Sequence, residues 1–96
     1  MWIAGVSFNP MGSHTSGTDI SSAVTLTPPD YGTNKILIQA LTQNVRFTLD
    51  GTTPTASVGF QLKAGDPPIV LTVHSAKVMK VIEETTTASL QYQWGQ

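Results

Sequence analysis

The feature that most constrains this chain is a series of short apolar runs, each closed by glycine, proline or aspartate. Within many runs apolar and polar residues alternate, which places the apolar side chains on one face of an extended strand. No run combines a helix-capping residue with an apolar stripe of 3.6-residue period. Short runs that recur about every 10 residues are typical of β-sandwiches and small barrels. We therefore predict an all-β fold, a single small antiparallel β-sandwich or jelly-roll-like domain.

The runs give eight candidate strands, at residues 2–8, 23–27, 35–41, 45–49, 58–62, 69–73, 77–82 and 88–94. The run at 35–41 is apolar on both faces, which favours a central strand, although its period alone leaves a helical turn open. It is expected to lie adjacent to the strand at 45–49, which ends in a strong turn dipeptide. The side chains expected to face the core are Ile36, Ile38, Val45, Phe47, Leu49, Ile69, Leu71, Val73, Leu90 and Tyr92.

The length and composition agree with this fold. A chain of 96 residues is long enough for one core only, so residues 1–96 are assigned to one domain. Serine and threonine together make up 22 of the 96 residues, and threonine favours strands over helices. The chain has no cysteine, so packing or partner subunits must supply the stability that disulfides give to other small domains.

Residues 9–22 interrupt the pattern of strands. The sequence NPMGSHTSGTDISS is rich in glycine and hydroxyl residues, and only Met11 and Ile20 are large and apolar. A structureless segment of this length is uncommon inside a small domain. We therefore expect a flexible arm or loop at about 9–22 that becomes ordered against a neighbouring subunit.

The charge pattern excludes several partners. Five basic and six acidic residues give a net charge of −1, and the basic residues are scattered along the chain. A nucleic-acid-binding surface needs a cluster of phosphate contacts, so we expect no nucleic acid as a partner. The chain has no apolar run of 18 residues, and its first eight residues lack a basic region. We therefore expect neither a membrane-spanning segment nor an export signal.

The sequence offers no catalytic or metal-binding constellation. It has two histidines, His14 in the arm and His74 at the end of a strand, and neither has a ligand at a suitable spacing. Ser75 follows His74 directly, and neighbours on a strand point to opposite faces, so these two residues cannot act together as nucleophile and base. Glu83 and Glu84 are expected to diverge in a solvated turn, and no phosphate-binding glycine motif is present. We therefore predict no catalytic residue, no cofactor and no metal site, and a protein that is not an enzyme.

One segment resembles a known family. The sequence VRFTLDGTTPTASVGFQL at residues 45–62, followed by KAGDPPIVL, is similar to a segment of small structural proteins of tailed bacteriophages. In those proteins a strand ends in T-x-DGT-x-PT and the next begins at G-[FY]-x-L. A similar TLDG-x-x-PT turn occurs in small sandwich modules appended to chitobiase-like enzymes. The resemblance covers about a third of the chain.

For a chain this short, the resemblance implies a virion structural protein such as a head decoration, cement or neck protein. It implies binding to a capsid or another virion protein, a homo-oligomer with a trimer favoured over a dimer, and a location in the virion after assembly in the host cytoplasm. The open edges of a sandwich also favour assembly, because unpaired edge strands must be covered or paired. The candidate interface residues are Trp2, Met11, Ile20, Tyr92 and Trp94.

A carbohydrate-binding accessory module is the alternative. In this hypothesis Trp2, Tyr92 or Trp94 stacks on sugar rings, and Gln91 and Gln93 bind the sugar hydroxyls. The hypothesis requires these aromatic rings to cluster on an exposed surface.

Overall fold

The computed structural model describes residues 7–17, 19–29, 32–73 and 78–96, which form eight strands and no helix. This confirms the all-β prediction. The described residues contain no helix that is long and apolar enough to cross a membrane. The strands are β1 (Thr15–Ser16), β2 (Val24–Leu26), β3 (Lys35–Leu41), β4 (Val45–Thr48), β5 (Phe60–Leu62), β6 (Ile69–Thr72), β7 (Met79–Glu83) and β8 (Ser89–Gly95). β2 to β8 each lie at a predicted strand, β1 was not predicted, and the predicted strand at 2–8 falls largely outside the described residues.

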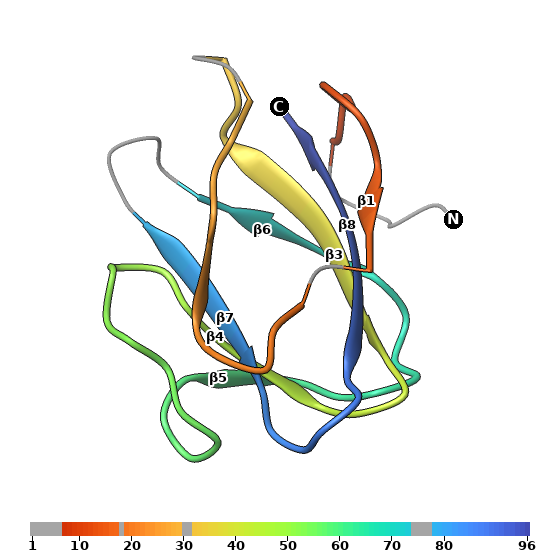
Figure 1. Cartoon of the computed structure of the whole chain (residues 1–96). Coiled ribbons are helices and arrows are strands. Elements are labelled where there is room, and N and C mark those ends of the chain that lie inside the picture. Colours follow the sequence, from red (N-terminus) through yellow and green to blue (C-terminus); the bar gives the residue numbers. More distant parts are fainter. Residues whose placement is uncertain (1–6, 18, 30–31, 74–77) are drawn as a thin grey trace.

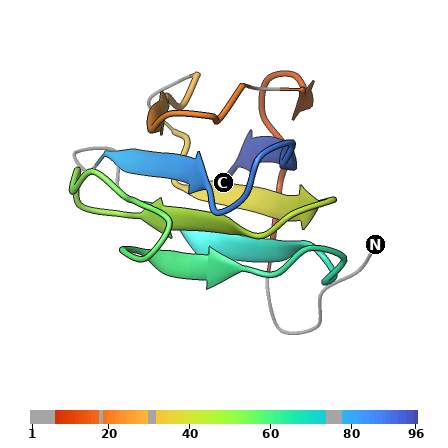
Figure 2. The ribbon, with the colours of Figure 1, turned by 60° about the horizontal axis from the view of Figure 1, so that its bottom comes forward.

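The strands form two four-stranded sheets, in the orders β1-β8-β3-β6 and β2-β7-β4-β5 (Figure 1). β1 pairs with β8, β2 with β7, β3 with β6 and β4 with β5, and every pair is antiparallel. The chain is thus a long hairpin that has been rolled up, with β3–β8 and β4–β7 pairing between its turns. This is the strand order of a jelly roll. Figure 2 shows the two sheets face to face, with β5 and β6 at one side of the stack and β1 and β2 at the other.

The core lies between the sheets, and the strand register explains which side chains fill it. Residues directly opposite each other in an antiparallel pair share a face of the sheet. Phe47 of β4 lies opposite Val81 and Phe60, and Ile38 of β3 lies opposite Ile69, so all five side chains face inward. The buried hydrophobic residues are Ile20, Leu26, Ile36, Ile38, Ala40, Val45, Phe47, Leu62, Val73, Met79, Val81, Leu90 and Trp94.

The predicted core is correct for most of its members. Leu49, Leu71 and Tyr92 are half-buried and pack against the buried cluster. Ile69 is the exception: its side chain faces inward from β6 but is 39% exposed, because β6 is the last strand of its sheet. The predicted adjacency of the strands at 35–41 and 45–49 is also wrong, because β3 and β4 lie in different sheets and the link between them crosses the sandwich.

The segment at 9–22 is not the free arm that the sequence predicted. Asn9 and Gln96 exchange two backbone hydrogen bonds of 2.8 and 2.9 Å, and the Met11 amide donates to the carbonyl of Trp94 at 2.8 Å. Further along, β1 pairs with β8. The described part of this segment therefore lies along the chain's own β8, and its ordering against a neighbouring subunit stays a prediction.

Ile20 anchors the end of this segment in the core. It lies in the crossover from β1 to β2, and only 1% of its surface is exposed. The Ser21 amide and hydroxyl both donate to Asp19 Oδ1, at 3.0 and 2.8 Å, and fix the turn around Ile20. These two hydrogen bonds hold the pKa of Asp19 below its ordinary value. The amide of Glu83 donates to the Ile20 carbonyl at 3.0 Å, which ties the crossover to β7.

Candidate functional site

The loop after β4 is built by its own side chains. Thr48 Oγ1 donates to the carbonyl of Thr52 at 2.5 Å, and the amide of Thr52 donates to Asp50 Oδ1 at 3.0 Å. Gly51 between them has φ 88°, a conformation that glycine adopts without strain. Pro54 is fully buried. Residues 48–54 thus have local structural roles in this turn.

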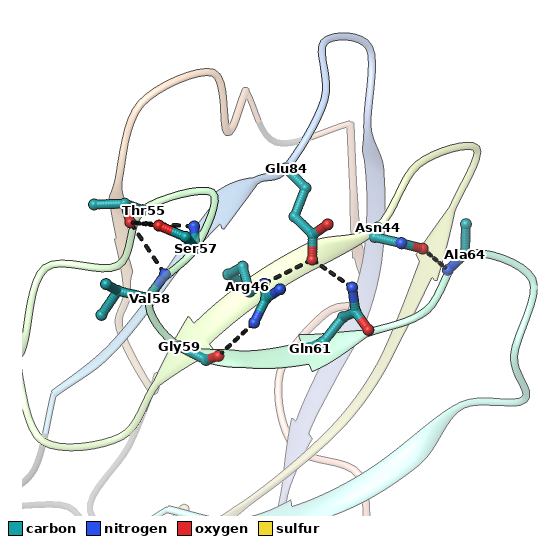
Figure 3. Close-up of polar contacts among 9 residues, drawn as sticks. All are labelled: Asn44, Arg46, Thr55, Ser57, Val58, Gly59, Gln61, Ala64 and Glu84. Carbon is teal, nitrogen blue, oxygen red and sulfur yellow. Dashed lines mark hydrogen bonds and ion pairs between the residues drawn. The ribbon is translucent and has the colours of Figure 1, made fainter.

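A second turn leads from this loop into β5. The amides of Ser57 and Val58 both donate to Thr55 Oγ1, at 3.2 and 3.1 Å (Figure 3). Gly59 follows with φ 126°, and a Cβ atom there would lie 2.9 Å from the carbonyl oxygen of Phe47. Only glycine fits at this position, because both the backbone conformation and the close contact exclude a side chain.

The two turns enclose a hollow at the start of β5. Its volume is about 530 Å³, within the range of small-molecule and side-chain pockets. Phe60 projects beside it with 66% of its surface exposed, and its ring centroid lies 5.6 Å from that of the buried Phe47. This aromatic contact links the exposed ring to the core. The lining residues are Thr48, Leu49, Asp50, Thr52, Gly59 and Phe60.

A smaller hollow of about 80 Å³ lies further along the same side, where Leu62 of β5 and Ile69 of β6 approach each other. Lys63, Asp66 and Pro67 of the link from β5 to β6, residues 63–68, line one wall of this hollow. The amide of Ala64 donates to Asn44 Oδ1 at 2.8 Å, and the amide of Gly65 donates to the Ala40 carbonyl at 3.2 Å. These bonds hold the link against the ends of β3 and β4. Leu62 is buried, whereas Phe60 and Ile69 at the same side are exposed.

A polar network covers the outer face of the sheet next to β5. Glu84 Oε2 accepts hydrogen bonds from Gln61 Nε2 at 2.6 Å and from Arg46 Nε at 2.7 Å, the second forming an ion pair (Figure 3). Arg46 also donates through Nη1 to the Gly59 carbonyl at 3.0 Å. The Gln61 amide, with a smaller contribution from Arg46, lowers the pKa of Glu84 below its ordinary value. The network ties β4, β5 and β7 together and has the character of a structural clamp.

The candidate interface residues do not gather on one exposed surface. Ile20 and Trp94 are buried in the core, and Tyr92 is half-buried against it. These side chains therefore pack mainly within the chain. Met11 is half-buried, and the Thr33 hydroxyl contacts its sulfur at 3.9 Å. Trp2 lies outside the described residues. Burial therefore removes Ile20 and Trp94 from a docking surface, while a role for Trp2, Met11 and Tyr92 stays a prediction.

Of the predicted sugar-binding platform the structure describes Tyr92, Trp94, Gln91 and Gln93, and not Trp2. The side-chain amide of Gln93 donates through Nε2 to the carbonyls of Met11 and Gly12, both at 3.0 Å. The side chain of Gln91 is hydrogen-bonded to that of His14. Both amides thus bind the 9–17 segment. The neighbouring Trp94 is buried, so it presents no ring for stacking.

Sequence reasoning missed Phe60, the most exposed large apolar side chain of the described residues. Alternation predicted a strand at residues 58–62, but it carried no information on the position of β5 at the edge of its sheet. Glu83 and Glu84 do diverge, since Glu84 joins the clamp while Glu83 lies on the inward face opposite Val45. His74 and Ser75 lie outside the described residues, and among the rest no three histidine, aspartate or glutamate residues come together as a metal site.

Comparison of the chain with models of protein families, with characterised proteins and with solved structures found no match. The site is therefore interpreted from its own geometry.

Proposed function

We propose that this chain is a non-enzymatic structural protein of a virion, which decorates or cements a phage capsid, or sits at its neck or tail, through contacts between subunits. The observation that carries the proposal is the side of the sandwich formed by β5 and β6. There Phe60 and Ile69, which the register turns toward the core, emerge into solvent beside two hollows. Partly exposed core residues of this kind are typical of a surface that another protein covers.

Two further features support this proposal. The loop next to the hollow is the segment that resembles phage structural proteins, so the resemblance and the exposed surface coincide at residues 48–60. The jelly-roll fold occurs in viral capsid domains, although it also occurs in lectins, so the fold alone does not decide between them.

The proposed partners are a capsid or other virion protein and further copies of this chain, with the virion as the location. The resemblance favours a trimer over a dimer. We expect neither nucleic acid nor a membrane as a partner, given the scattered charges of the sequence.

Binding to particles tests the proposal. The reading frames that neighbour this gene identify the capsid or tail proteins encoded with it, and particles assembled without this chain provide the target. We expect the purified chain to sediment with those particles and to be released by Phe60→Asp. Failure to bind any of the neighbouring structural proteins, with the wild-type chain folded, would contradict a virion function.

The carbohydrate-binding alternative keeps one specific observation in its favour. Phe60 offers an exposed aromatic ring next to the oxygen-bearing side chains of Asp50 and Thr52 in the same hollow. Ligand-detected NMR with a panel of mono- and disaccharides distinguishes this function. Saturable binding that Phe60→Ser abolishes would support a sugar site here, whereas no binding at millimolar sugar would remove it.

A further inference from the structure

Each of the edge strands β5 and β6 exposes a residue whose neighbours across the sheet, here called its row, are buried. In the row of Phe47, the side chains of Val81 and Phe47 are 0% and 5% exposed, while Phe60 at the edge is 66% exposed. In the row of Ile38, exposure rises from 1% to 39% at Ile69. Leu62 of β5 is buried, so the core is open at this side around Phe60 and Ile69, where a second apolar surface could cover them.

The shape of this side is self-complementary. Phe60 forms a projection, and the hollow of about 530 Å³ lies directly beside it, large enough for a phenyl ring. When a projection and a matching hollow lie on the same surface, two copies related by a twofold axis can fill each other's hollows. An unrelated partner would have to provide both features from another sequence.

The charge of this side also suits a second copy. A twofold axis brings identical regions of two chains close together, so a charged edge would repel itself. Neither β5 nor β6 contains a charged residue, and the described lining of the hollow contains a single one, Asp50. Lys63 and Asp66, of opposite sign, follow in the link between them.

We propose that the β5/β6 side binds the same side of a second copy of this chain, with the Phe60 ring of each copy seated in the hollow of the other. The two β5 strands then run antiparallel across the twofold axis, and the two Phe60 rings pack near each other and near Leu49 of the opposite copy. This arrangement favours a dimer over the trimer that the resemblance implies. It adds a surface and a partner to the proposed function and holds whether or not the assembly belongs to a virion.

Sedimentation velocity of the full chain over a wide range of concentrations tests the association. We expect a reversible dimer for the wild-type chain and a dissociation constant about tenfold higher or more for Phe60→Asp. Ser16→Asp places the same charge on β1, at the opposite edge, and should leave the dimer unchanged. Circular dichroism and amide NMR spectra of both variants confirm that they fold.

Cross-linking locates the interface independently of these variants. The chain has no cysteine, so Gln61→Cys introduces a unique thiol on β5, and Ser16→Cys introduces one on β1. We expect a disulfide-linked dimer on mild oxidation of Gln61→Cys only. A wild-type chain that is monomeric at all concentrations, a trimer, or selective cross-linking through Ser16→Cys would each overturn the inference. Binding of a monomeric chain to capsids would overturn the inference but leave the proposed function intact. A dimer that does not bind capsids would support the inference but contradict the proposed function.

Discussion

The two sides of this sandwich differ in how the link between the sheets covers the core. At each side, a link joins the edge strand of one sheet to the edge strand of the other: residues 17–23 join β1 to β2, and residues 63–68 join β5 to β6. The first link places Ile20 in the core, whereas the second contains no large aliphatic residue and is held against the strand ends. The comparison teaches that a single aliphatic side chain in a link can close one side of a jelly roll, while the side whose link lacks one leaves Phe60 and Ile69 exposed.

The largest expected effect comes from removing the closure. Ile20→Ala should lower the free energy of unfolding by about 2–5 kcal/mol, since it leaves a cavity among buried side chains. The same substitution at Ile69, on the open side, should cost about 1 kcal/mol or less, because 39% of that side chain is already in water. Urea denaturation of both variants, at a concentration where the chain is monomeric, measures the difference.

Equal losses for Ile20→Ala and Ile69→Ala would break the comparison, because they would mean that both sides are closed to the same degree in solution. A change in the slope of the urea transition would show that the substitution had altered more than local packing.

A smaller effect is expected at the turn that shapes the open side. Gly59→Ala should destabilise the chain by about 1–3 kcal/mol, because its φ of 126° strains any side chain and the new Cβ would meet the Phe47 carbonyl at 2.9 Å. Gly65→Ala is the matched control, since its φ is also positive, at 83°, but its Cβ would have nothing within 4 Å. Thermal unfolding should rank Gly59→Ala below Gly65→Ala. The opposite order would show that the contact with β4 is not as close as described.

Phe60 itself should contribute little to the fold of one subunit. Phe60→Ser should change the free energy of unfolding of the monomer by about 1 kcal/mol or less, whereas Phe47→Ala at the opposing buried position should cost about 3–5 kcal/mol. If Phe60 serves an interface, the loss for Phe60→Ser should grow as the protein concentration rises, because association stabilises the folded chain. A loss that is large and independent of concentration would place Phe60 in the core rather than at an interface.

The sequence predicted which side chains of a strand face the core better than it predicted where that strand lies in its sheet. The apolar run at 35–41 predicted β3 with its observed bounds, and alternation predicted the inward faces of β4 and β8, since the side-chain period depends only on the local backbone. It could not show that Phe60 and Ile69 lie on edge strands, because the strand order arises from the rolling of the whole hairpin. Ile20 was misjudged for a related reason: one aliphatic residue among glycines and hydroxyls has no periodic neighbours, and only the tertiary fold buries it.

The smallest predicted effect concerns the pH dependence of the closed side. Because the Ser21 amide and hydroxyl lower the pKa of Asp19, the folded chain binds the Asp19 proton more weakly than the unfolded chain does. The stability that Asp19 contributes is therefore fully present above the ordinary pKa of aspartate, and it is lost as the pH falls through the lower pKa of the folded state. Asp19→Asn should melt slightly below the wild-type chain at pH 6, and the difference should shrink between about pH 5 and pH 3. Glu84→Gln provides the comparison at the β4–β5–β7 clamp, because the pKa of Glu84 is lowered in the same direction, mainly by Gln61. A constant difference between Asp19→Asn and the wild-type chain across this range would show that the turn around Ile20 does not depend on the charge of Asp19, and that burial of Ile20 alone closes this side.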